Sequence, residues 1–191
     1  MQSRYRKDPE TATIIGRLSD NVHILYENTQ KARPWHSLYR ELEVVRNYLR
    51  IQQVRFGRTL NAEFSITLSD EELKSVKVPA MLLQIHTENA VEKGIRNRKG
   101  AGNFFLGIKC TDDGCSIVIE DDGRGRRDTD SPRKGSTFVM NELIELFNNY
   151  NEVPVTVEYD DFIFGEYGTR VRIFIPKHFN YELSKTENTR R

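Results

Sequence analysis

Cysteine is scarce in this chain of 191 residues, which contains only Cys110 and Cys115. The two flank a short polar turn, "TDDG", and they face each other across the hairpin that the neighbouring segments predict. Two cysteines do not make the disulfide framework of a small secreted domain, so we interpret both as cytoplasmic thiols that fill strand positions. Because no cluster of cysteine and histidine offers further ligands, a zinc site is not expected.

Long apolar runs and an excess of one charge are missing as well. No stretch approaches the roughly 18 apolar residues of a membrane-spanning helix, and none has the pattern of a signal peptide. With 29 basic and 28 acidic residues the net charge is +1, which gives no overall field to attract nucleic acid or an anionic membrane. We therefore expect a cytoplasmic globular protein that does not bind nucleic acid.

The first third of the chain has the periodicity of two amphipathic helices. Apolar residues recur at helical spacing in two segments, with Pro34 between them because proline disfavours helix on its N-terminal side. Ser37 is positioned to cap the second helix, although the residue three positions later is an arginine, so the full capping box is absent. The apolar positions are Ile14, Leu18, Val22 and Leu25 in the first segment and Leu38, Leu42, Val45 and Leu49 in the second.

The remainder of the chain mixes strand and helix signals. Five segments rich in β-branched and aromatic residues predict strands: "AEFSITL", "NFFLGIKC", "CSIVIED", "VPVTVEY" and "TRVRIFI". Between the third and fourth lies a helix whose core-facing side we expect to carry Val139, Leu143, Leu146, Phe147 and Tyr150. Helices interleaved with these strands favour a two-layer α/β sandwich, a mixed sheet covered by helices. The last residues, from 179 to 191, are polar and are expected to form a tail.

Asp121 belongs to the most informative segment, "IEDDGRG". It alternates with Ile117 and Ile119, so a strand here points its carboxylate toward the core. A buried carboxylate is costly unless a partner satisfies it, and the glycines that follow allow a ligand to approach the backbone closely. An amine-bearing ring such as adenine fits this position. The alternative is that Asp121 opens a polar turn and the glycines only shape that turn.

Asn89 belongs to a second segment, "VPAMLLQIHTENAVEKGI". We expect a helix with Pro79 at its first position and Gly94 just past its end. Asn89 then shares an apolar face with Leu82 and Ile85, three and four positions apart. Together with Glu88 and Lys93, this amide suits a hydrated Mg²⁺ and its phosphate ligands, because Mg²⁺ takes few protein ligands. The alternative is a core asparagine with satisfied hydrogen bonds.

These segments, followed by "EYGTRVRIFIP", resemble the ATP-binding domain of bacterial two-component sensor histidine kinases. The resemblance extends upstream through residues 8–57 and points to the subgroup with an N-P-H-F-type phosphoacceptor motif. It implies a Bergerat-type (GHKL, HATPase) fold, with a helical segment at 1–56 that follows the phosphoacceptor region, a catalytic domain at 57–178 and a polar tail at 179–191.

The resemblance also implies the roles of individual residues. Asp121 would accept the adenine amine, Gly123 and Gly125 would let the chain pass close to the nucleotide, and Thr169 would reach the base through water. Asn89 would coordinate Mg²⁺. Glu88 would orient or activate the acceptor, and Lys93 would neutralise phosphate charge. Gly135 would belong to the lid over the phosphates, together with the basic run 124–134. The alternative interpretation of this run is a solvated loop.

Function follows from the same resemblance. The chain would transfer the γ-phosphoryl group of ATP to a histidine outside it, because none of its four histidines sits in the expected motif. Its partners would be a response regulator, its own upstream phosphoacceptor helix and a second copy in a homodimer, and the full-length protein would be anchored in the inner membrane. His86, inside the predicted Asn89 helix, is expected to be a packing residue.

Two departures from the family pattern keep alternatives open. Only Gly135 precedes the helix after the lid, where the family has a glycine pair, and Glu92 stands near the expected phosphates. A degenerate kinase-fold module without transfer activity is therefore the alternative, and an ATPase of the wider superfamily is a weaker one. We expect ATP and ADP to bind with similar affinity, because side chains after Gly135 restrict the phosphate contacts.

Overall fold

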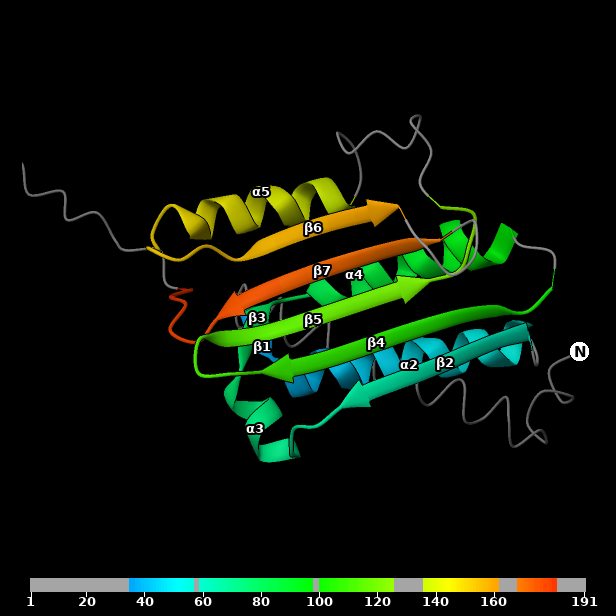
Figure 1. Cartoon of the computed structure of the whole chain (residues 1–191), viewed down its shortest axis with the longest axis horizontal. Helices are drawn as coiled ribbons and strands as arrows, with labels where there is room; N and C mark the ends of the chain where they lie inside the picture. The colour runs from blue at the N-terminus through cyan, green and yellow to red at the C-terminus, as the bar shows by residue number, and fades with distance from the viewer. Residues whose placement is uncertain (1–34, 57–58, 98–99, 126–135, 162–167, 182–191) are drawn as a thin grey trace, which may run out of the picture.

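The computed structural model describes residues 35–56, 59–97, 100–125, 136–161 and 168–181. Its centre is a five-stranded mixed sheet of order β2-β4-β5-β7-β6, in which β2 and β4 are parallel and the other neighbours are antiparallel (Figure 1). The strands are β2 (Leu60–Ile66), β4 (Gly102–Cys110), β5 (Gly114–Asp121), β6 (Thr156–Asp161) and β7 (Thr169–Pro176). All five correspond to the segments predicted from the sequence, and the α/β class is confirmed.

Helices cover one face of this sheet. Figure 1 shows α2 (Leu38–Phe56) and α4 (Leu82–Asn89) behind the strands, with α5 (Ser136–Asn148) on the β6 side. The predicted apolar stripe of α2 is buried, and it shares one core with alternate residues of the strands. The second predicted amphipathic helix therefore packs against the sheet. Ser37 Oγ accepts a hydrogen bond from Arg40 N at 3.3 Å, as the expected cap.

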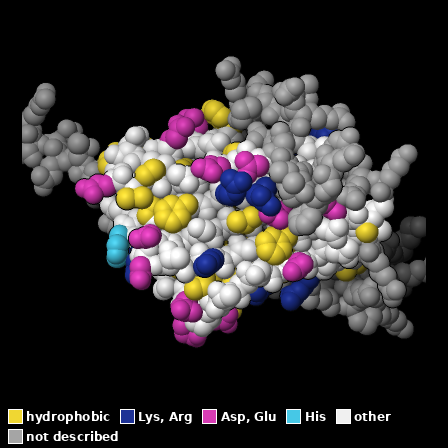
Figure 2. Space-filling model, viewed as in Figure 1, with side chains coloured by type: hydrophobic (Ala, Val, Ile, Leu, Met, Phe, Trp, Pro, Cys, Tyr) yellow, Lys and Arg dark blue, Asp and Glu magenta, His cyan; other side chains and the backbone are white. Residues whose placement is uncertain are grey.

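The opposite face of the sheet is covered by no helix within the described ranges. Figure 2 shows hydrophobic side chains on this face separated by charged ones. Ion pairs cross the strands here: Arg170 Nε lies 2.5 Å from Glu120 Oε1, and Arg172 pairs with Asp160. Alternation of inward apolar and outward charged residues is what the period of a half-buried strand requires.

A second, two-stranded sheet joins β1 (Trp35–Ser37) to β3 (Lys77–Pro79), and a short helix, α3 (Asp70–Ser75), precedes β3. These elements were not predicted from the sequence. The signal for α3 was present, since Ser69 and Glu72 form a reciprocal capping box at its start. The strands β1 and β3 have three residues each, too few to show a period.

The boundaries predicted for the Asn89 helix are wrong at both ends. Pro79 ends β3, where it pairs with Trp35, and α4 begins at Leu82 after Met81, whose φ is 68°. At the other end the chain continues as a π-helix, Ala90–Gly94, and a 3₁₀ turn, Ile95–Asn97. Gly94 is thus not a stop signal. A glycine is needed at this position because a β-carbon would overlap the Asp121 side chain.

Most of the α5 residues that were predicted to face the core do not lie there. The residues that enter the core are Met140, Ile144 and Phe147, whereas Val139 is 66% exposed and Leu146 41% exposed. The helix has two adjacent apolar stripes, and periodicity alone does not decide which one meets the sheet.

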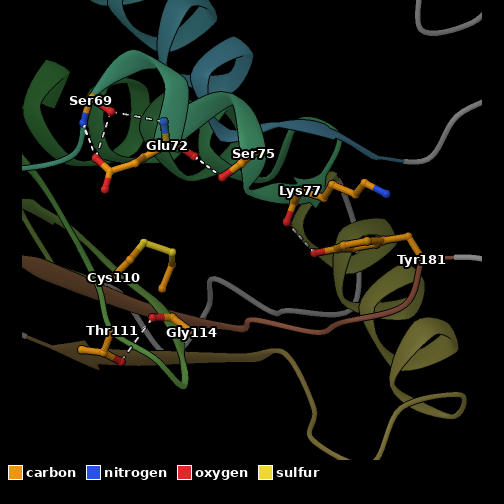
Figure 3. Close-up of a disulfide and its surroundings, with 9 residues drawn as sticks. Ser69, Glu72, Ser75, Lys77, Cys110, Thr111, Gly114 and Tyr181 are labelled. Carbon is orange, nitrogen blue, oxygen red and sulfur yellow. Dashed lines mark hydrogen bonds between the residues drawn. A yellow bond between two sulfur atoms is a disulfide. The ribbon is translucent and has the colours of Figure 1, made fainter.

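The interpretation of Cys110 and Cys115 as free thiols is contradicted, because the two form a disulfide. They are direct partners in the antiparallel register of β4 and β5, with Cα atoms 4.0 Å apart. Figure 3 shows the bond beside Thr111 and Gly114 of the same hairpin. The hairpin was correctly predicted, and the pairing follows from its register.

The end of the described chain is packed more firmly than a polar tail. Tyr181 is 5% exposed, and its hydroxyl donates to Lys77 O at 3.0 Å (Figure 3). The side chain amide of Asn151 and the backbone of Asn180 exchange two hydrogen bonds. The described chain is therefore packed through Tyr181, whereas the domain division stays a prediction. In the described ranges no helix combines the length and apolarity needed to cross a bilayer.

Candidate functional site

Asp121 lies at the C-terminal end of β5 and is buried, 4% exposed, on the same face as Ile117 and Ile119. Its Oδ1 accepts a hydrogen bond from Gly123 N at 2.9 Å, and Thr169 stands opposite it in the register with β7. Burial raises the pKa of Asp121 to about 7, helped by the neighbouring Asp122, while Gly123 N and the Thr169 hydroxyl act in the opposite direction. The predicted buried carboxylate is confirmed.

Gly94 and Gly123 bring α4 and its π-helical continuation against this carboxylate. A β-carbon on Gly94 would overlap the carboxylate of Asp121, and one on Gly123 would overlap the backbone of Gly94. Two segments about thirty residues apart in the sequence meet here without any side chain between them. The glycines at both positions are required by this close approach.

The chain beyond Gly123 turns along the same contact. Arg124 Nε donates to Lys93 O at 3.0 Å, which ties the turn to the π-helix. Gly125 has a φ of 71°, a value that favours glycine, and a β-carbon there would lie 3.3 Å from Gly168 O. The glycines of the "DDGRG" segment therefore serve both the close packing and the turn.

Asp122 is held differently from Asp121, although it is equally buried. Its two carboxylate oxygens accept from Asn103, the backbone N at 2.7 Å and the side chain Nδ2 at 2.5 Å. This pairing fixes the end of β5 to β4 and leaves Asp121 as the carboxylate at the contact with Gly94. The sequence pattern alone does not distinguish these two roles.

Asn89 is the last α-helical residue of α4 and is half-buried. Its Nδ2 donates to Thr137 Oγ1 at 2.9 Å, so the first turn of α5 contacts the end of α4. Glu88 Oε1 accepts from Gln84 Nε2 at 2.7 Å, one helical turn earlier. Thr137 was not predicted from the sequence as a site residue.

Lys93 and Glu92 lie in the π-helix, a rare element that frequently occurs at functional sites. Lys93 is exposed. Glu92 pairs with Arg55 at 3.0 Å and with Arg96 at 2.6 Å, so two guanidinium groups offset the negative charge that departs from the family pattern. Tyr48 of α2 lies near this group. Burial of its hydroxyl raises the pKa of Tyr48, and the negative charges of Glu92 and Glu88 raise it further.

The structure thus brings Asp121, Gly123 and Thr169 together at one end of the sheet. It also connects the Asp121 turn to the segment of Lys93, and it places Asn89 against Thr137. Gly135 and most of the basic run 124–134 lie outside the described residues. The prediction for His86 agrees with the structure: it is 2% exposed, packs on Tyr159, and burial lowers its pKa to about 4.

Comparison with known proteins agrees with this arrangement. The histidine kinase family model matches residues 1–60. The sensor protein LytS of Staphylococcus epidermidis is 25% identical over 161 residues, which cover 78% of this chain and 27% of LytS. The sensor histidine kinase YpdA of Escherichia coli is 28% identical over 185 residues, which cover 92% of this chain and 30% of YpdA. The chain is thus similar to sensor histidine kinases over most of its length.

Solved structures support the fold. The histidine kinase domain of the blue-light activated kinase of Erythrobacter litoralis superposes with a TM-score of 0.55 at 17% identity, covering 89% of this chain and 76% of that one. The histidine kinase AdeS of Acinetobacter baumannii gives a TM-score of 0.51, also at 17% identity, covering 88% and 81%. The chain spans about 30% or less of the length of the curated relatives LytS and YpdA.

Proposed function

We propose that this chain is the catalytic part of a sensor histidine kinase, which binds ATP with Mg²⁺ and transfers the γ-phosphoryl group to a histidine outside residues 1–191. The observation that carries the proposal is the buried Asp121 carboxylate, which lies directly against Gly94 and Gly123. An adenine amine would donate to this carboxylate, whose ionised form accepts hydrogen bonds. Thr169, its partner in the register, would contact the same base through water.

Mg²⁺ and the phosphates belong, in this proposal, beside the end of α4. Asn89 would contribute its amide oxygen to the ion while Thr137 holds the amide nitrogen. Mg²⁺ needs few such protein ligands because it keeps several waters. Glu88 would orient the acceptor and Lys93 would offset phosphate charge, since phosphoryl transfer depends mainly on positioning and charge stabilisation. Gly135 would complete the lid, and similar affinities for ATP and ADP stay a prediction.

Calorimetric titration with ATP and MgCl₂ tests binding. Asp121→Asn should abolish it with little loss of fold, because an amide nitrogen would face the adenine amine and leave donors unpaired, at a cost of about 1–3 kcal/mol. Asp113→Asn, on the exposed tip of the β4–β5 hairpin, is the matched control and should bind as the wild type does. Undiminished affinity in the Asp121 variant would remove this residue from the site.

Transfer is tested by adding a separate peptide with an N-P-H-F-type phosphoacceptor segment and γ-labelled ATP. Acid-labile phosphate on the peptide supports the kinase. Binding without transfer would favour the alternative, a degenerate module of the same fold. The response regulator, the homodimer and the membrane anchor would belong to the whole protein, and we propose them only from the similarity to sensor histidine kinases.

A further inference from the structure

Glu41 is a buried carboxylate that the proposed phosphoryl transfer does not use. It is 1% exposed, on the core side of α2, one turn from Leu38 and Val45. Burying an ionised carboxylate is unfavourable unless several donors surround it. The structure supplies four donors, and three of them are backbone N–H groups of one short stretch.

Those three N–H groups mark the start of α4. Glu41 Oε1 accepts from Met81 N at 2.7 Å, and Oε2 accepts from Leu83 N at 2.8 Å and from Gln84 N at 3.4 Å. The N-cap residue, Met81, has no side chain capping bond of its own. Glu41 therefore caps α4 from another helix. Its negative charge also interacts favourably with the positive end of the helix dipole.

Met81 itself shows how much this cap constrains. Its φ of 68° is the only positive value of a non-glycine residue in the described part of the chain. A left-handed conformation costs a residue with a side chain roughly 1–2 kcal/mol. The bond from Met81 N to Glu41 offsets that cost, so Glu41 fixes the point at which α4 begins and the direction in which it leaves.

The fourth donor is His36 Nε2, from β1. His36 pairs with Val78 in the small sheet, and Leu38 N donates to Val76 O at 2.8 Å. The start of α2 and the segment before α4 are thus one unit around Glu41.

We propose that Glu41 is a positioning residue for the candidate Mg²⁺ site: by fixing the N-terminus of α4 it places Glu88 and Asn89 at the other end of that helix. This inference rests on the proposed function. Asn89 lies only about 10 Å along the axis from Leu82, at 1.5 Å per residue. Arg55 pairs with Glu92 just beyond it, so α2 holds both ends of the helical stretch.

The test compares Glu41→Ala and Glu41→Gln with Glu43→Gln, a matched control on the exposed side of α2. The readout is the gain in nucleotide affinity that Mg²⁺ provides, measured as the ratio of the ADP dissociation constants without and with MgCl₂. Glu41→Ala should reduce this ratio about tenfold, equivalent to roughly 1.4 kcal/mol, and leave the affinity for metal-free ADP within about twofold. Glu41→Gln, which keeps one acceptor, should lie between Glu41→Ala and wild type. Glu43→Gln should match wild type.

A purely structural cap would give a different result. Glu41→Ala would then lower the unfolding temperature without changing the Mg²⁺ ratio well below that temperature, and this outcome would overturn the proposal. If Glu41→Ala does not fold, the ratio measured for Glu41→Gln decides in the same way, with an unchanged ratio counting against positioning.

A second readout needs no nucleotide. The NMR signals of the Asn89 side chain amide should shift in Glu41→Ala, and the amides of Met81, Leu83 and Gln84 should exchange with solvent at least about tenfold faster, because their acceptor is gone. A wild type that binds no nucleotide would refute the proposed function, whereas unshifted Asn89 signals would refute the role of Glu41.

Discussion

Gly94 and Asp121 are in direct contact, with no room for a β-carbon between the backbone of one and the carboxylate of the other. The contact joins the π-helix after α4 to the end of β5, and Arg124 strengthens it through Lys93 O. It explains why two weak sequence signals, a glycine after a helix and an aspartate before a glycine turn, belong to one site.

Gly94→Ala should therefore disturb both the fold and the candidate nucleotide site. The added methyl group would push on the Asp121 carboxylate, and overpacking of this kind costs about 1–3 kcal/mol. Urea unfolding should show the loss, and ATP affinity should fall with it. Gly107→Ala is the control, because its β-carbon would lie 3.0 Å from the flexible ring of Phe105 on the open face of the sheet. An unchanged unfolding midpoint for Gly94→Ala would contradict the contact.

The sequence predicted the strands and the buried Asp121 because both depend on the two-residue period of a strand. It misplaced the start of α4 because that helix has no local cap: its acceptor is Glu41, forty positions away. A signal existed, since Glu41 falls within the apolar stripe of its own helix. The face of α5 was misassigned because two apolar stripes adjoin and only contact with the sheet selects one.

His86 and Asp121 should oppose each other in the pH dependence of stability. Folded His86 stays neutral down to about pH 4, while in the unfolded chain its pKa is 6.5, so its contribution is complete above 6.5 and is lost as pH falls toward 4. Folded Asp121 stays protonated up to about pH 7, whereas its pKa in the unfolded chain is 3.8. Its contribution to the free energy of unfolding is therefore complete below pH 3.8 and is lost as the pH rises toward 7. Each slope is about 1.4 kcal/mol per pH unit.

Between about pH 4 and 6.5 these two slopes therefore cancel in the wild type. Asp121→Asn should unmask the histidine, so that its free energy of unfolding falls as the pH is lowered. His86→Phe should show the reverse, a free energy that falls as the pH is raised. Urea unfolding at several pH values measures both, with His178→Gln, at an exposed position, as the control. Slopes of the same sign in the two variants would refute the assignment.

The Cys110–Cys115 disulfide should affect stability and leave nucleotide binding unchanged. It closes a loop with a sequence separation of 5, and loop-closure entropy for so short a loop amounts to about 2 kcal/mol. Cys115 and Asp121 lie at opposite ends of β5, about 20 Å apart at roughly 3.3 Å per residue. Dithiothreitol should release two thiols and lower the unfolding midpoint, with no change in ATP affinity.

The double variant Cys110→Ser and Cys115→Ser provides the reference for this experiment. It should have the lower midpoint from the start and should not respond to dithiothreitol. Two reactive thiols in protein purified without reductant would show that the bond does not form under those conditions.

Thr137 should hold the Asn89 amide in the orientation that Mg²⁺ requires. Its hydroxyl accepts from Asn89 Nδ2 at 2.9 Å, which directs the amide oxygen away from α5. Thr137→Ala removes a hydrogen bond worth about 1 kcal/mol and should lower the affinity for ATP in the presence of Mg²⁺ about fivefold. Affinity for metal-free ADP should not change, because Asp121 and Thr169 are untouched. Thr137→Ser keeps the hydroxyl and is the matched control. Equal Mg²⁺ dependence in Thr137→Ala and Thr137→Ser would show that the bond does not orient a metal ligand, and Asn89 would then be a core amide whose partner is interchangeable.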